Sequence, residues 1–234
     1  MNYLVFLLFG LVPSLIWLAF YLRKDAHPEP NSMIRKVFFW GMLATLPAIA
    51  LELTLRSLFS LLPLPPAIIL VLYIFLGVAL VEELFKFLVV RVFVYKNRAL
   101  DEPLDLMLYM IIAALGFAAF ENILILFGLG PASPFSNIAA LTLARLVGAT
   151  FLHALTSGTL GYFLARSFFD PAKKHGYLVF GLFLAILLHG FFNFYILEME
   201  GVQKLLVPGV ILAGLAIFVS TGFRQLKRIT ASKQ

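Results

Sequence analysis

Two adjacent carboxylates and an amine lie inside one of the most apolar stretches of the chain, Val81-Glu82-Glu83-Leu84-Phe85-Lys86. A charged side chain at the middle of a bilayer costs at least about 2.5–3.5 kcal/mol, so charges in such stretches are functional candidates. Residues three and four apart share a helix face, so Lys86 lies beside both Glu82 and Glu83. We expect Lys86 to pair with one carboxylate and to leave the other free for chemistry.

Other apolar stretches carry further polar side chains: Glu121 and Asn122, Arg145 and His153, and His189 and Asn193. A carboxylate held near a histidine in a partly dry cavity can take a proton from water and make it a nucleophile. Either Glu82 or Glu83 is the expected base. His189 and Asn193, four residues apart, can donate two hydrogen bonds to one oxyanion. His153 is expected to orient the water or to protonate the leaving amine.

The elements that position these groups are predicted to be membrane helices. Of the 234 residues, 62% are hydrophobic and 13% are charged, and the apolar runs exceed the roughly 18 residues that span a bilayer. Strands are not expected, because an open strand edge cannot be satisfied in hydrocarbon. The sequence therefore predicts an all-α, polytopic membrane protein with one domain over residues 1–234 and a retained first helix. Its seven expected spans are residues 3–22, 35–61, 67–94, 104–128, 138–166, 177–197 and 203–223.

Charge and cysteine content narrow the classes of function. Most of the 18 Lys and Arg residues lie in the loops after the first, third, fifth and seventh spans, which predicts an outside amino terminus and a cytoplasmic carboxyl terminus. These cations are scattered over short loops, so the net charge of +6 does not indicate nucleic-acid binding. The absence of cysteine excludes disulfides, thiolate metal sites and a cysteine nucleophile.

Depth in the membrane indicates whether the polar groups can meet. At about 1.5 Å per residue, Glu82 and His153 each lie roughly 22 Å from the outer end of their span. His189 lies roughly 12 Å and Glu121 roughly 10 Å from theirs. Small residues near His153, such as Gly158, would let a neighbouring helix approach closely. We therefore expect these groups to converge on one small wet cavity.

Some of the charged residues have plainer interpretations. Arg145 is expected to form a fixed ion pair, with Glu121 as a partner at similar depth, or to reach the membrane surface. Glu52 and Arg56, four residues apart, are expected to form an ordinary intrahelical pair. Even Glu82, Glu83 and His189 could belong to a buried network that only fixes packing.

The sequence resembles the PrsW-type intramembrane proteases, which are related to the CAAX prenyl endopeptidases. Glu82-Glu83-Leu84-Phe85-Lys86 is similar to that family's Glu-Glu-x-x-Lys signature, and Asp25-Ala26-His27-Pro28-Glu29-Pro30 is similar to its acidic, proline-rich segment. Gly116-Phe117-Ala118-Ala119-Phe120-Glu121-Asn122 is similar to its fourth-span motif, and two helices with single histidines follow. The resemblance covers about residues 20–195.

The resemblance implies an all-helical core and metal-independent, glutamate-based hydrolysis of a peptide bond, with no cofactor. It also implies a membrane-anchored protein substrate, such as an anti-sigma factor, and a bacterial plasma membrane as the location. The CAAX relatives have histidine where this chain has Glu121, and arginine where it has Lys86. Either Glu121 or His153 therefore fills the second catalytic position.

Other functions are left open by the residues themselves. A proton or cation transporter could use the same Glu and His side chains, although the sequence lacks the inverted repeats and broken helices typical of transporters. A non-catalytic membrane scaffold could keep them for packing. Two histidines and a glutamate could also hold zinc, but the chain has no His-Glu-x-x-His spacing. The lipid bilayer is the expected surrounding in each case, and the sequence does not specify an oligomeric state.

Overall fold

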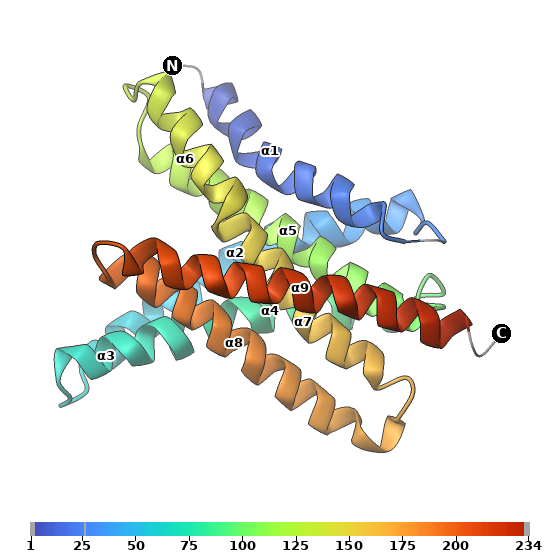
Figure 1. Ribbon diagram of the computed structural model, residues 1–234. Coiled ribbons are helices and arrows are strands. Elements are labelled where there is room, and N and C mark those ends of the chain that lie inside the picture. Colours follow the sequence, from blue (N-terminus) through green and yellow to red (C-terminus); the bar gives the residue numbers. More distant parts are fainter. Residues whose placement is uncertain (1–2, 26, 232–234) are drawn as a thin grey trace.

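The computed structural model describes residues 3–25 and 27–231, and within them it contains helices and no strands (Figure 1). Seven segments are long and apolar enough to cross a membrane, which confirms the all-α fold with seven spans. These segments are Tyr3–Leu22, Asn31–Ser60, Pro66–Phe93, Pro103–Gly128, Phe135–Arg166, Pro171–Glu198 and Gln203–Ile229.

Prolines mark the beginning of several helices. Pro30, Pro65 and Pro134 directly precede helices, and Pro103 is a first helical residue, where a missing N–H costs no hydrogen bond. The second span therefore begins at Asn31 rather than at residue 35. The α-helices are α1 (Tyr3–Leu22), α2 (Asn31–Ser60), α3 (Pro66–Leu72), α4 (Leu80–Phe93), α5 (Pro103–Gly128), α6 (Phe135–Val147), α7 (Ala149–Arg166), α8 (Lys174–Glu198) and α9 (Gln203–Ala231).

Two of the seven spans are not regular helices. In the third, the π-helical segment η1 (Tyr73–Ala79) joins α3 to α4 and ends three residues before Glu82. In the fifth, Gly148 has φ −104° and ψ −101°, outside the helical range, and separates α6 from α7. The indole nitrogen of Trp17 donates a 2.8 Å hydrogen bond to the Leu146 carbonyl beside this break. A short 3₁₀ turn, η2 (Pro171–Lys173), precedes α8.

Helix α5 forms the core of the bundle. It is 72% buried over its most apolar window, against 22% to 39% for the other spans. It packs against α7, α2 and α1, and in Figure 1 it passes through the middle of the molecule, with α9 crossing in front. Gly116 of α5 lies against the Phe38 backbone, and Gly41 of α2 lies against the Ala113 backbone. The helices that carry Glu52 and Glu121 are thus held in direct backbone contact.

Candidate active site

The structure brings the predicted polar residues into one cluster. Glu82, Glu83 and Lys86 come from α4, His153 from α7 and His189 from α8, and each of the five is at most 5% exposed. The two imidazole rings lie edge to face with centroids 5.1 Å apart. The expected convergence of these groups is therefore confirmed.

Lys86 lies at the centre of the cluster. Its Nζ donates hydrogen bonds to Glu83 Oε1 at 2.8 Å, Glu82 Oε2 at 3.1 Å and His153 Nδ1 at 2.7 Å, which uses all three ammonium protons. The expectation that Lys86 pairs with only one carboxylate is wrong, because the spacings of three and four place both acids within its reach. The ring of Phe117 covers the ammonium at 4.8 Å.

Glu83 is fully buried, and both of its oxygens are hydrogen-bonded. Its Oε1 accepts from Lys86, from Thr156 at 3.1 Å and from Nδ1 of His189 at 3.0 Å. Its Oε2 accepts from Ser157 Oγ at 2.7 Å. A buried carboxylate is stable when it is satisfied in this way. Glu83 therefore holds the lysine and one histidine in place and has no oxygen facing open space.

Glu121 of α5 also contacts the cluster, and it forms an ion pair with Arg145. Its Oε2 accepts from Arg145 Nη2 of α6 at 2.7 Å and lies 3.0 Å from Nε2 of His153. Arg145 Nε donates to the Asn122 Oδ1, and the Asn122 amide donates to Thr150 Oγ1 at 3.0 Å. The expected Glu121–Arg145 ion pair is present. Because Arg145 lies in the last turn of α6, just before Gly148, the pair links this helix end through Glu121 to His153.

Hydrogen bonding assigns the protons on the two imidazole rings. Lys86 donates to Nδ1 of His153, so that nitrogen carries no proton. The proton of the His153 ring is therefore on Nε2, which donates to Glu121. Nδ1–H of His189 donates to Glu83, which leaves Nε2 as an acceptor 3.8 Å from Glu82 Oε2. Asn193 is half-buried, and its side chain makes no hydrogen bond within residues 3–25 and 27–231. Its role in binding an oxyanion stays a prediction.

Glu82, unlike Glu83, borders open space. It lines a cavity of about 260 Å³ between α2, α4 and α5, together with Thr45, Ile49, Glu52, Phe117, Glu121, Leu124 and Ile125. The Thr45 hydroxyl donates to the Phe117 carbonyl at 3.2 Å and ties α2 to α5 there. A molecule in this cavity would meet Glu82 together with Glu121 and Glu52, whereas Glu83 is not part of the lining.

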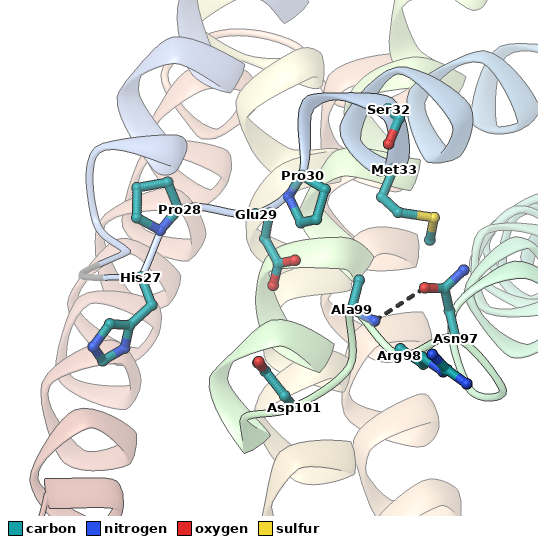
Figure 2. A pocket seen from close by; sticks show the side chains of 10 residues that line it. All are labelled: His27, Pro28, Glu29, Pro30, Ser32, Met33, Asn97, Arg98, Ala99 and Asp101. Atoms are coloured by element: carbon teal, nitrogen blue, oxygen red, sulfur yellow. Dashed lines mark hydrogen bonds between the residues drawn. The ribbon is translucent and has the colours of Figure 1, made fainter.

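A larger cavity of about 730 Å³ lies elsewhere, among the loops that join α1 to α2 and α4 to α5 (Figure 2). Glu29 and Asp101 lie on one side of it, and Asn97 accepts a hydrogen bond from the Ala99 backbone on the other. None of its lining residues belongs to the Glu/His cluster. This larger cavity is therefore not the candidate catalytic site.

Thr156 and Ser157 are the functional residues that the sequence argument missed. The Ser157 hydroxyl donates a hydrogen bond to Glu83 Oε2, and the Thr156 hydroxyl donates one to Oε1. Both residues lie three or four positions after His153 and so share its helix face. That spacing was the signal that could have found them.

Comparison with known proteins agrees with this arrangement. Residues 29–221 match the model of the family described as "PrsW family intramembrane metalloprotease". The chain belongs to the PrsW family. It is 31% identical to the protease PrsW of Geobacillus kaustophilus over 82% of this chain and 79% of the relative. For the protease PrsW of Oceanobacillus iheyensis the identity is 29% over 87% and 88%, and for that of Bacillus subtilis it is 27% over 79% of each chain.

The PrsW family membership makes this chain an intramembrane protease of a bacterial membrane. No solved structure matches it.

The family description names a metalloprotease, and the cluster contains a donor set that fits a divalent ion. Among the described residues, one ligand atom each of Glu82, His153 and His189 lie within 4.8 Å of one another. Two imidazole nitrogens and one carboxylate oxygen are a common zinc donor set. The second nitrogen of each ring binds a carboxylate, as the rings of metal-ligating histidines usually do.

Lys86 competes with a metal ion for this position. Its ammonium is hydrogen-bonded to two of the three ligand atoms, Glu82 Oε2 and His153 Nδ1. A divalent ion at the same atoms would have to displace that contact, because two cations in one small site repel each other. The expected metal-independent mechanism therefore stays a prediction.

Proposed function

We propose that the chain hydrolyses a peptide bond of a membrane-anchored protein, with Glu82 as the base that activates water. The observation that carries the proposal is the position of Glu82, which lines the cavity between α2, α4 and α5 while Lys86 and two histidines surround its other side. The resemblance adds an anti-sigma factor as an example of such a substrate.

The chemistry follows from the groups around Glu82. The 3.8 Å between Glu82 Oε2 and His189 Nε2 is too long for a hydrogen bond, and it suits one water molecule bound to both atoms. Glu82 takes a proton from this water while the water oxygen attacks the carbonyl carbon of the substrate. When the C–N bond breaks, Glu82 returns the proton to the leaving amine. Lys86 supplies a fixed positive charge close to the developing negative charge.

The two neighbouring acids have different roles in this proposal. Glu83 is committed to four hydrogen bonds and holds Lys86 and His189. Glu121 is committed to Arg145 and His153 and holds the other ring. Glu121 also lines the cavity but is paired with Arg145, whereas Glu82 lies 3.8 Å from Nε2 of His189, which supports Glu82 as the base.

The test uses purified protein reconstituted with a single-pass membrane substrate. We expect Glu82→Gln to lower kcat by about 10²-fold or more, because general base catalysis is worth about 10²–10⁴. His189→Ala should also lower kcat, whereas Glu200→Gln, which changes an exposed acid outside the cluster, should cleave like the wild type. Cleavage by Glu82→Gln at the wild-type rate would overturn the assignment.

A metal-assisted version of the same reaction is favoured by the Glu82, His153 and His189 donor set. A divalent ion held there would supply a Lewis acid that polarises the scissile carbonyl. A chelator, combined with measurement of the metal content of the protein, separates the two mechanisms. Cleavage by metal-free protein supports Glu82 as the base, whereas loss of cleavage that zinc restores would replace this mechanism with the metal-assisted one.

A further inference from the structure

Glu52 is a half-buried acid in the active-site cavity that the mechanism does not use. It projects from α2 into the same cavity as Glu82 and Glu121. Its Oε1 is shielded from solvent and has no hydrogen-bond partner among the described residues. Buried polar atoms are almost always hydrogen-bonded, so an orphaned carboxylate oxygen beside a catalytic site needs a physical explanation.

The expected intrahelical pair with Arg56 does not provide that explanation. No ion pair joins Glu52 to a cation within residues 3–25 and 27–231, so this expectation is wrong. The Arg56 guanidinium lies 5.7 Å from the ring centroid of Tyr73 and lines a different cavity, towards Leu197 and Glu198. Arg56 therefore makes a cation–π contact with Tyr73 instead of an ion pair with Glu52.

The other cations near the cavity are already engaged. Lys86 donates all three protons to Glu82, Glu83 and His153. Arg145 is held by Glu121 and Asn122. Glu52 therefore lines the space in which a substrate would lie and has an unpaired acceptor, which a donor carried by the substrate would satisfy.

The substrate of an intramembrane protease carries such donors when it is cut. A carbonyl in an intact helix is shielded by the turn around it, so the segment must unwind before water can attack. Unwinding frees backbone N–H groups, and an unsatisfied N–H is costly where no water is present. We propose that Glu52 binds a backbone N–H of the unwound substrate segment and so acts as a substrate-binding residue next to Glu82. This assignment rests on the proposed function.

The test is a double-mutant cycle between the protein and the substrate backbone. Wild type and Glu52→Leu are reconstituted with a synthetic single-span peptide that the wild type cleaves. The peptide is also made as a series in which one amide N–H at a time near the cut is replaced by an ester oxygen. We expect Glu52→Leu to raise KM about tenfold, the loss typical of one hydrogen bond to a charged group, with kcat nearly unchanged.

The ester series gives a result that a purely structural role would not give. One ester position should raise KM for the wild type but not for Glu52→Leu, because the two changes remove the same hydrogen bond. Leu53→Ala, on the exposed neighbouring residue of α2, is the control and should leave KM unchanged. Glu52→Leu should be at least as stable as the wild type, because it removes an unsatisfied buried oxygen.

The failure of this proposal is distinguishable from that of the proposed function. If the wild type cleaves the peptide, Glu82→Gln does not, and no ester position is coupled to Glu52, the role of Glu52 is overturned while the proposed function stands. If Glu52→Leu lowers kcat and leaves KM unchanged, Glu52 acts in the chemical step and the binding role is also overturned. If the wild type cleaves no single-span peptide, both proposals fall together.

Discussion

Each charged residue of the cluster is stabilised by specific partners, and those partners separate groups that hold the site from groups that face the substrate. Both oxygens of Glu83 and all three ammonium protons of Lys86 are hydrogen-bonded to protein groups. Glu82 and Glu52 both line the cavity, and Oε1 of Glu52 has no hydrogen-bond partner among the described residues. A buried charge that is fully satisfied stabilises a local structure, whereas a partly satisfied one is available to bind something else.

The role of Ser157 as a ligand of Glu83 predicts a loss of stability. Ser157→Ala should lower the free energy of unfolding by about 1.5–3 kcal/mol, because Oε2 of Glu83 loses its partner in a buried site. Thermal unfolding in detergent measures this change. Ser60→Ala, in which an exposed hydroxyl bound to its own helix is removed, is the matched control and should change stability by less than about 0.5 kcal/mol. Equal effects of the two variants would contradict the role of Ser157.

At the scale of the elements, the site depends on close contact between α2 and α5. The cavity at Glu82 has one wall on each of these helices, and Gly116 lets their backbones touch. The irregular segments η1 and Gly148 also lie close to the site, since they precede Glu82 and His153 in their spans. π-helical segments occur frequently at functional sites, where they shift the register of the residues that follow.

Gly116→Ala should therefore harm both stability and cleavage. The added methyl group would meet the Phe38 backbone carbonyl, which cannot move aside as a side chain does, so we expect a loss of about 1–3 kcal/mol. Gly128→Ala on the same helix is the control, because a methyl group there meets nothing within 4 Å. Thermal unfolding and cleavage rate are measured for both variants. Full activity and stability in Gly116→Ala would contradict close packing of α2 on α5.

The loop between α1 and α2 is attached to α5 by a buried acid outside the membrane spans. Glu29 is 7% exposed and accepts a 2.5 Å hydrogen bond from the Tyr109 hydroxyl. Burial raises the pKa of Glu29 above its ordinary value of 4.5, and the neighbouring acids Asp25 and Asp101 raise it further, against the lowering effect of hydrogen bonds from Tyr109 and Asp105. The folded chain therefore holds this proton more tightly than the unfolded chain does.

The raised pKa of Glu29 fixes the sign of a pH effect on stability. Its contribution is fully present below pH 4.5 and is lost as pH rises through the folded-state pKa. Glu29→Gln keeps an acceptor for Tyr109 but cannot titrate, so its thermal stability should fall less with rising pH than that of the wild type. Identical pH profiles for the two proteins, measured by thermal unfolding in detergent, would show that Glu29 is not involved.

At the scale of the whole molecule, the sequence predicts the seven spans and the meeting of their polar groups. Length and hydropathy set the spans, and the cost of charge in lipid singles out Glu82, Glu83, Lys86 and the histidines. The outside amino terminus stays a prediction from the Lys and Arg distribution. Which of two adjacent acids faces the cavity could not be predicted, because both lie within reach of Lys86 and only the partners from α7 and α8 distinguish them.

The partners of Lys86 and Glu52 were predicted wrongly because helix spacing alone does not decide between possible partners. Helix spacing shows which pairs are within reach, and Glu52 and Arg56 satisfy that rule as well as Lys86 and its acids do. The choice between an intrahelical partner and a partner on another element depends on packing. Arg56 lies against the ring of Tyr73 instead of pairing with Glu52, whereas Lys86 pairs with both acids of its own helix and also contacts His153.

The most direct test of the central claim, that Glu82 activates a water molecule inside the bundle, is cleavage of a reconstituted single-pass substrate in ¹⁸O-labelled water. Mass spectrometry of the products then measures both the cut and the origin of the new oxygen. We predict that the wild type places one labelled oxygen on the new carboxyl terminus and that Glu82→Gln forms almost no product. Labelled product formed equally fast by Glu82→Gln would contradict the claim.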